Sequence, residues 1–284
     1  MIKVWLDSYK PANKEDALQA LREIMQEIAL AGLQRTGFFE HAAFYGGTAL
    51  RIFHGLNRFS EDLDFSLLKA NPDFSLDKYL EGVQNEFESL GMKVSIKEKQ
   101  KARQNSIESA FLKSETIWKE LVLDTIIPQA GLDQKINIKI KIEVDTRPPM
   151  NFQTEEKLLL KPFSFYVKCF ALPYLFAGKM HALLFRKWKS NVKGRDWYDV
   201  EWYVKKGITL HLPHFIARAQ DSGDWSKNTI TESEFRELLK IKIDTVDMSR
   251  IREDIIRFIP DPKAIDIWSA QYFHDLAVHL KVNS

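Results

Sequence analysis

The segment from Ala42 to Leu68 constrains the fold most, because it joins four short patterns in a fixed order. An apolar run from Ala42 to Tyr45 predicts a strand, and Thr48 to His54 has the composition of a helix. Leu63 to Leu68 predicts a second strand, and Gly46-Gly47 predicts the turn that leads from the first strand into the helix. Elements this close in sequence pack as neighbours, so the segment predicts an α/β unit.

A second strand signal lies between Lys135 and Asp145, where apolar and polar residues alternate strictly. The apolar set is Ile136, Ile138, Ile140, Ile142 and Val144, and the polar set is Asn137, Lys139, Lys141, Glu143 and Asp145. Successive side chains of a strand point to opposite faces. The pattern therefore predicts a half-buried strand that displays two acids at its end.

The rest of the first half also alternates between helix and strand patterns. Lys14 to Arg35 has helical periodicity after a cap residue, Asn13, and Leu76 to Leu90 predicts another helix before Gly91. Met92 to Glu98 and Ser106 to Leu112 predict strands.

The pattern changes after Pro148-Pro149, and from Pro173 onward it becomes helical. The predicted helices are Tyr174 to Trp188, Trp197 to Lys205, Thr231 to Ile241, Ser249 to Phe258, and an interrupted segment from Pro262 to Leu280. We therefore expect an α/β domain over residues 1–160 and a helical domain over residues 161–284.

Composition excludes several classes of protein. The chain has 284 residues, of which 45% are hydrophobic, and it nowhere has about 18 consecutive apolar residues. It therefore predicts a globular protein with no membrane span. A single cysteine, Cys169, fits a reducing compartment, so we expect a cytoplasmic location. The net charge of +2 does not by itself mark a nucleic-acid binder.

The glycine turn is a candidate phosphate site. Glycines let backbone amides approach a ligand closely, and a helix that begins at Thr48 would add its N-terminal dipole. Most Gly-Gly-Thr triplets are only turns and caps, and this one is not followed by the lysine of a Walker loop.

Two acids, Asp62 and Asp64, occupy alternate positions at the second strand and should share one face of it. They could pair with Arg58 or lie on a solvated edge, but beside the glycine turn we favour a metal site. Catalysis by two metal ions needs a third carboxylate. Glu143 and Asp145 are both candidates, and we prefer Glu143 because it lies deeper in its strand.

Basic and acidic residues also recur later in the chain. Lys179 and Arg186 should share one helix face, and Asp196 and Asp199, three residues apart, should share a face of the next helix. From Lys179 to Arg195 there are six basic residues and no acid. A solvated helix end, an N-cap at Asp196 or ordinary ion pairs would explain the same pattern.

Taken together, these motifs resemble the AbiEii/AbiGii toxin family of nucleotidyltransferases. The resemblance rests on GGTALR, RFSEDLDF, IKIEVD, KMHALLFR and RDWYDVEWYV, which follow one another in the family's order over residues 41–206. It implies an α+β fold: a nucleotidyltransferase-like mixed β-sheet flanked by helices, followed by a helical C-terminal domain. Members of this family are usually the toxins of bacterial toxin–antitoxin pairs.

The resemblance also implies roles for individual residues. Gly46, Gly47 and Thr48 would hold the triphosphate together with Arg51, Arg58 and Lys179. Asp62, Asp64 and Glu143, or Asp145 in its place, would bind Mg²⁺ or Mn²⁺. The implied catalytic set is Asp62, Asp64, Glu143, Lys179, Asp196 and Asp199. The family often has aspartate where this chain has Glu143.

The function that these residues predict is transfer of a nucleoside monophosphate from a nucleoside triphosphate (NTP) to an acceptor hydroxyl. The expected acceptor is RNA, at the 3′ end of tRNA, and the expected protein partner is an antitoxin. One alternative is a small-molecule acceptor, as aminoglycoside nucleotidyltransferases have. Another is an inactive protein that binds only nucleotide or antitoxin.

Overall fold

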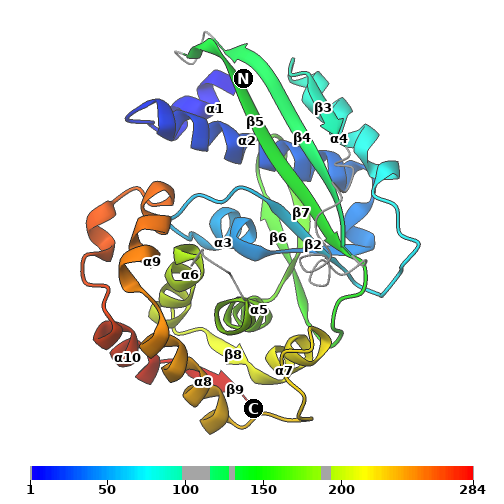
Figure 1. The fold of residues 1–284 in the computed structure, drawn as a ribbon. Helices are drawn as coiled ribbons and strands as arrows, with labels where there is room; N and C mark the ends of the chain where they lie inside the picture. Colours follow the sequence, from blue (N-terminus) through cyan, green and yellow to red (C-terminus); the bar gives the residue numbers. More distant parts are fainter. Residues whose placement is uncertain (1, 98–115, 128–131, 187–192, 284) are drawn as a thin grey trace, which may run out of the picture. The chain divides into compact units, whose positions relative to one another are not determined.

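The computed structural model describes residues 2–97, 116–127, 132–186 and 193–283, which fold as two compact units (Figure 1). The sheet unit comprises Met1–Phe53, Phe59–Pro148 and Glu155–Cys169. The helical unit comprises His54–Arg58, Pro149–Thr154 and Phe170–Ser284. Two short segments inside the first half of the chain, 54–58 and 149–154, thus belong to the helical unit.

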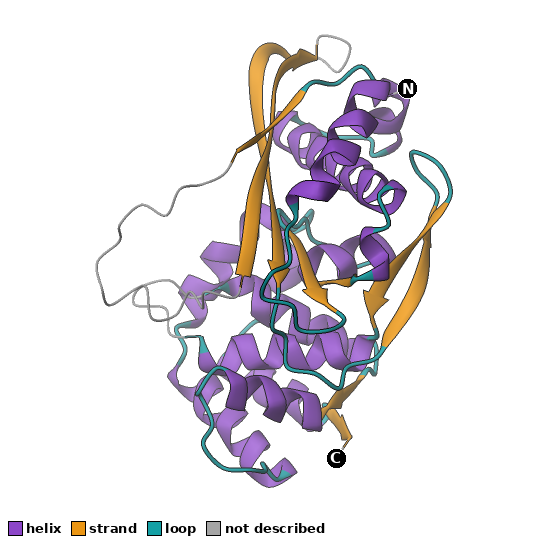
Figure 2. Cartoon of the chain, turned by 90° about the vertical axis from the view of Figure 1, so that its right-hand side faces the viewer, coloured by secondary structure: helices purple, strands orange, loops and turns teal. Residues whose placement is uncertain are grey.

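A seven-stranded mixed sheet forms the centre of the sheet unit. Its strands are β1 (Ala42–Tyr45), β2 (Leu63–Leu67), β3 (Val94–Lys97), β4 (Thr116–Ile127), β5 (Leu132–Asp145), β6 (Thr154–Leu159) and β7 (Phe165–Phe170). They lie in the order β3-β4-β5-β2-β1-β7-β6. β4 and β5 form a long antiparallel pair (Figure 2). β2 runs parallel to β5.

Four helices accompany the sheet: α1 (Ile2–Ser8), α2 (Lys14–Arg35), α3 (Gly46–His54) and α4 (Asp77–Ser89). A short 3-10 helix, η1 (Phe38–Glu40), precedes β1. α2 packs against α4 and β5. It begins as its sequence predicts, because the Asn13 side chain accepts a hydrogen bond from the Asp16 amide at 2.9 Å and so caps the first turn.

The alternation predicted for β5 is confirmed where the structure describes its side chains. Ile138, Ile140, Ile142 and Val144 are buried in the core. On β2, Leu63 and Phe65 are buried in the same core. The polar residues between them therefore point to the opposite face of the sheet, away from the core that includes α2.

Several elements differ from the sequence prediction. α3 begins at Gly46, two residues earlier than predicted, because the glycine pair itself forms the first turn. β2 begins at Leu63, so Asp62 lies one residue before the strand. β4, β6 and β7 were not predicted from the sequence, and the strand predicted at Ser106 to Leu112 lies outside the described residues.

An acid of α2, Glu27, is buried in the sheet unit. It lies beside Glu23, and its Oε2 atom has no hydrogen-bond partner among the described residues. Burial, and after it the charge of Glu23, raises the pKa of Glu27 to about 8. The folded chain therefore binds this proton more tightly than the unfolded chain does.

Glu27 should make the protein less stable as pH rises. Its contribution is fully present below its ordinary pKa of 4.5 and is lost as pH rises through about 8. Glu27→Gln stays neutral, so its free energy of unfolding should exceed that of the wild type by a growing margin between about pH 5 and about pH 9. Denaturant unfolding across this range measures the margin, and a margin that does not change with pH would contradict the assignment.

The helical unit contains α5 (Leu172–Phe185), α6 (Gly194–Lys205), α7 (Leu212–Asp221), α8 (Glu232–Thr245), α9 (Met248–Ile255) and α10 (Ala270–Val278), with two 3-10 turns, η3 (Ile256–Phe258) and η4 (Pro262–Ile265). Two short strands, β8 (Thr209–His211) and β9 (Lys281–Asn283), run parallel. α5 packs against α6 and α7, and α6 packs against α9. The helical character predicted for this part of the chain is confirmed, while α7 and the two strands were missed.

No helix in the described ranges is both long enough and apolar enough to cross a membrane.

Candidate functional site

Gly46 brings the start of α3 against an acidic side chain of β2. Its φ of +83° lies in the left-handed region that favours glycine. A Cβ atom built on this residue would come within 2.4 Å of Asp64 Oδ2. Only glycine therefore fits both the turn and the close approach of the Asp64 carboxylate.

Thr48 links the same helix to the other acid. Its side chain is fully buried, and its hydroxyl donates a hydrogen bond of 2.5 Å to the backbone oxygen of Asp62. Thr48 was predicted to hold phosphate, but its hydroxyl is engaged with the protein backbone. Its side chain therefore fixes the position of Asp62 relative to the first turn of α3.

Thr48→Val keeps the shape of the side chain and removes this donor. Because a buried hydrogen bond is lost, we expect a destabilisation of roughly 1–3 kcal/mol. Thr48→Ser keeps the hydroxyl and loses only a methyl group, so its cost should be smaller. Denaturant unfolding compares the two variants, and an equal or larger loss in Thr48→Ser would show that packing outweighs the hydrogen bond.

The acids of β2 and β5 lie in register. β2 is parallel to β5, with Asp64 opposite Glu143 and Ser66 opposite Asp145, and antiparallel to β1, with Asp64 opposite Tyr45. Residues opposite one another on neighbouring strands project to the same face. Asp64 and Glu143 are therefore nearest neighbours, and Asp145 lies one step further along the same face.

The strand register distinguishes the two candidates for the third carboxylate. Glu143 adjoins Asp64, whereas Asp145 adjoins Ser66 and accepts a hydrogen bond from the Arg147 amide at 3.1 Å. A lysine also joins this face, because the ammonium of Lys141 contacts Glu143 Oε1. The polar periodicity of β5 places Lys141 beside Glu143, so the sequence contained a signal for this contact that was not used.

These acids suit a hard cation. Among the described residues, no group of three or more His, Cys, Asp or Glu side chains is arranged to hold a metal ion. Mg²⁺, however, usually takes one or two carboxylates together with substrate phosphates and water. Asp64 and Glu143 offer two such carboxylates beside the turn at Gly46, and Glu143 already binds a cation, the ammonium of Lys141.

Arg51, on α3, is held within the sheet unit. Its Nε lies 2.8 Å from Glu23 Oε2, and its guanidinium carbon lies 4.7 Å from the centroid of the Phe59 ring. Tyr9 also donates to Glu23, through a hydrogen bond of 3.1 Å to Oε1. These contacts attach α3 to α2 and explain an arginine at this position without a ligand.

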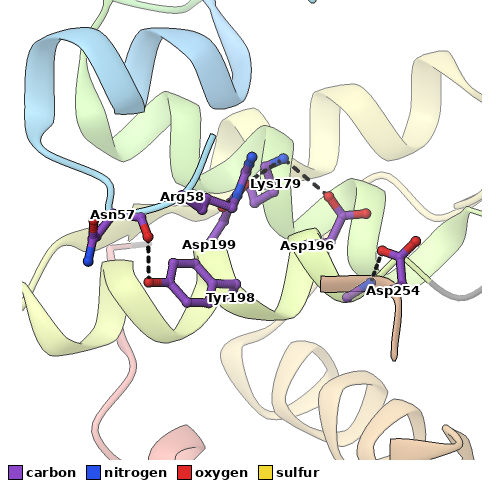
Figure 3. Close-up of polar contacts among 8 residues, drawn as sticks. Asn57, Arg58, Lys179, Asp196, Tyr198, Asp199 and Asp254 are labelled. Atoms are coloured by element: carbon purple, nitrogen blue, oxygen red, sulfur yellow. Dashed lines mark hydrogen bonds and ion pairs between the residues drawn. The ribbon is translucent and has the colours of Figure 1, made fainter. Parts of the chain in front are cut away.

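The basic and acidic residues predicted in the second half form one network in the helical unit (Figure 3). Lys179 Nζ, on α5, lies 2.8 Å from Asp199 Oδ2 and 3.1 Å from Asp196 Oδ1, both on α6. Arg58 Nε and Nη2 lie 2.6 and 2.7 Å from the two oxygens of Asp199. Lys179, Asp196 and Asp199 were candidate site residues from the sequence, but neither their ion pairs nor the pairing of Arg58 with Asp199 was predicted.

Burial and charge act against each other in this network. Burial alone would lower the pKa of Lys179, but Asp199 and Asp196 outweigh burial and hold that pKa above its ordinary value. Burial would likewise raise the pKa of Asp196, but Lys179 and Arg186 keep it below its usual value. These shifts favour the charged forms of Lys179 and Asp196, in an interior where an isolated charge would be costly.

Asp199 differs from the other acids in having no exposed surface. The exposed fraction of its side chain is 0%, compared with 16% for Lys179 and 7% for Asp196. Of the residues predicted to be catalytic in this half of the chain, Lys179 is the one that is most exposed.

The chain resembles known proteins in sequence and in fold. Residues 28–274 match the family described as nucleotidyl transferase AbiEii toxin, Type IV TA system. No curated protein sequence matches the chain. Among solved structures, MenT4, a nucleotidyltransferase toxin from Mycobacterium tuberculosis H37Rv, is 14% identical with a TM-score of 0.51, and the match covers 99% of each chain.

A second solved structure, JHP933 from Helicobacter pylori, is 16% identical with a TM-score of 0.48, and the match covers 92% of this chain and 88% of that one. At such identities the likeness to MenT4 shows the fold, and the family is shown by the sequence match, which spans most of the chain. This chain belongs to the AbiEii family of nucleotidyltransferases, the toxins of Type IV toxin–antitoxin systems.

Proposed function

We propose that this nucleotidyltransferase depends on a divalent metal and transfers a nucleoside monophosphate to a hydroxyl of RNA, at the 3′ end of tRNA. Membership of the family implies an NTP substrate and a cognate antitoxin. The observation that carries the metal-dependent part is the register of β2 and β5, which sets Asp64 opposite Glu143 while Asp64 contacts the turn at Gly46.

The reaction makes one bond and breaks one bond. The acceptor oxygen bonds to the α-phosphorus of the NTP, the bond from that phosphorus to the bridging oxygen breaks, and pyrophosphate leaves. The acceptor hydroxyl loses its proton in the process. Protein groups therefore have to position the triphosphate and the acceptor, and to offset the negative charge that gathers on the leaving group.

The turn at Gly46 and Gly47 supplies the phosphate contacts. Both residues lie in the first turn of α3, where backbone N–H groups have no partner within the helix. Such N–H groups and the helix dipole favour a phosphate. Thr48 supports this turn from within, through its hydrogen bond to the Asp62 backbone.

Asp62, Asp64 and Glu143 are the residues that would hold Mg²⁺ or Mn²⁺. Bound there, such ions would lower the pKa of the acceptor hydroxyl and neutralise charge on the leaving pyrophosphate. Thr48 holds the backbone at Asp62, Gly46 leaves room for the Asp64 carboxylate, and Lys141 offsets the charge of Glu143 until substrate arrives.

Lys179 offers a further contact to phosphate. An ammonium has three N–H donors, and in the described part of the chain Asp196 and Asp199 accept from two of them. The third can donate to a phosphate oxygen, because the side chain is partly exposed. The two carboxylates fix the direction of the ammonium, which is the role we propose for Asp196.

An RNA acceptor is supported by the charge of the chain near Lys179. The stretch from Lys179 to Arg195 has six basic residues and no acid. Cations of this density bind the phosphate backbone of a nucleic acid. A metabolite acceptor would need no such stretch.

A transfer assay tests the proposal. The protein is incubated with Mg²⁺, each labelled NTP in turn and total RNA, beside the variant Asp62→Ala. We expect label in RNA with the wild type and not with the variant, and omission of Mg²⁺ should abolish it. If the wild type labels no RNA, or if Asp62→Ala labels it equally well, the proposed function is wrong.

Glu143 and Asp145 should differ in their importance. Because Glu143 adjoins Asp64 and Asp145 adjoins Ser66, Glu143→Gln should lower the rate of transfer by roughly 100-fold or more, and Asp145→Asn by about tenfold or less. The Mg²⁺ concentration for half-maximal rate should rise mainly in Glu143→Gln. The reverse order of effects would make Asp145 the third carboxylate.

A further inference from the structure

The network around Lys179 has balanced charge only because it includes Arg58. Lys179 and Arg58 carry two positive charges, and Asp196 and Asp199 carry two negative ones. Without Arg58, the remaining three side chains would carry a net charge of −1. Lys179 would then be the cation in contact with both carboxylates, and the carboxylate charge left unbalanced would repel the phosphates of a nucleotide.

Arg58 forms a two-point ion pair with Asp199. Its Nε and Nη2 approach the two carboxylate oxygens at 2.6 and 2.7 Å, which is the bidentate arrangement of an arginine fork. Arg58 is 2% exposed and the Asp199 side chain 0%. Bulk water is therefore excluded from this pair, and Asp199 Oδ2 accepts from both Arg58 Nη2 and Lys179 Nζ.

The segment that carries Arg58 is also tied to α6 by its backbone. The Tyr198 hydroxyl donates a hydrogen bond of 2.9 Å to the Asn57 oxygen (Figure 3). Tyr198 and Asp199 are adjacent on α6, so two neighbouring side chains hold two neighbouring residues of this segment. The backbone contact keeps the guanidinium in place, while the fork supplies the charge.

We propose that Arg58 is a positioning residue that acts through Asp199: its guanidinium balances this carboxylate, so that Lys179 is not left to neutralise both carboxylates and can still donate to the phosphates of the NTP. The inference rests on the proposed function, in which Lys179 contacts a phosphate. Arg58 itself touches no substrate, and Asp199 is likewise a positioning residue.

The KM for NTP should depend on the charge balance of the network and not on which residues supply the charges. Arg58→Gln leaves a net charge of −1 and should raise the KM for NTP by roughly 10- to 100-fold, with a smaller change in kcat. The double variant Arg58→Gln/Asp199→Asn restores neutrality with a glutamine and an asparagine that can hydrogen-bond. Its KM should return to within about threefold of the wild-type value.

Two further variants separate charge from folding. Arg58→Lys keeps the charge and loses the fork, so it should lower the temperature of unfolding while the KM stays near the wild-type value. Tyr198→Phe removes the tie to Asn57 and no charge, and the fork to Asp199 remains, so it should raise the KM less than Arg58→Gln does. Thermal unfolding of each variant shows which are folded at the assay temperature.

The experiment measures KM and kcat for NTP at saturating RNA, with the affinity for NTP measured by calorimetry. A double variant with the same raised KM as Arg58→Gln, or an Arg58→Lys variant with a raised KM, would overturn the role of charge. If Arg58→Gln does not fold, the KM values of Arg58→Lys and of the double variant still test the role of charge. Absence of transfer by the wild type would instead refute the proposed function.

Discussion

Replacing Asp64 with asparagine should nearly abolish nucleotidyl transfer without unfolding the protein. The change removes the central carboxylate of the proposed metal site, and we expect the rate to fall by about 1,000-fold, or roughly 4 kcal/mol. The fold should not suffer, because Asp64 lies directly opposite Glu143 and like charges in that position repel. A transfer assay and a thermal unfolding curve measure the two effects.

Asp73→Asn is the matched control for Asp64→Asn. Asp73 is an exposed acid of the same unit and lies outside the sheet, so the same substitution there should change neither the rate nor the stability. If Asp64→Asn were to lose activity only in proportion to a loss of folded protein, its role would be structural. Retention of more than about a tenth of the wild-type rate would exclude Asp64 as a principal metal ligand.

Gly46→Ala should impair both the fold and the chemistry. The new Cβ would come within 2.4 Å of Asp64 Oδ2, so the carboxylate has to move, and a displacement of about 1 Å in an active site costs roughly 100-fold in rate. The φ of +83° adds a backbone cost of about 1–3 kcal/mol for any residue with a Cβ. Transfer rate and free energy of unfolding are the two measurements.

Gly91→Ala separates the two costs. Gly91, which follows α4, has a similar φ of +75°, but a Cβ there meets nothing within 4 Å. It should therefore show the backbone cost alone, with an unchanged rate of transfer. If Gly46→Ala kept the same rate as Gly91→Ala, the approach of Asp64 to Gly46 would have no part in catalysis.

Periodicity was enough to predict the elements whose residues are buried on one side. The described part of β5 matches its prediction because its apolar side chains form one face against the core. α2 matches because its apolar residues have helical spacing, although all residues from Glu23 to Leu33 are buried. β6 escaped prediction because its burial does not alternate cleanly: Glu155 is half-buried and Leu158 is exposed. The membership of 54–58 in the helical unit depends on contacts with distant residues, which no local pattern encodes.

The candidate site was predictable where its chemistry is local in sequence. The glycine turn and the paired acids lie within about twenty residues of one another, and the register of β2 with β5 then brought Glu143 to Asp64. The partner of Arg58 was not predictable, because Asp199 lies 141 residues away and any acid would have looked equally suitable. The sequence predicted that Thr48 contacts phosphate. The hydrogen bond from its hydroxyl to the Asp62 backbone was not predicted, because no sequence pattern marks such a contact.

The separation of Arg58 and Asp199 in the sequence also delays formation of their ion pair during synthesis of the toxin. Asp199 leaves the ribosome 141 residues after Arg58, which at about 5–20 residues per second is a delay of roughly 7–28 s. During that delay the nascent chain already contains the glycine turn and the acids of β2. Asp199, the ion-pair partner of Arg58, has not yet been synthesised. A chain that ends before α6 therefore lacks both carboxylates of the Lys179 network, and translation must pass this helix before the network can form.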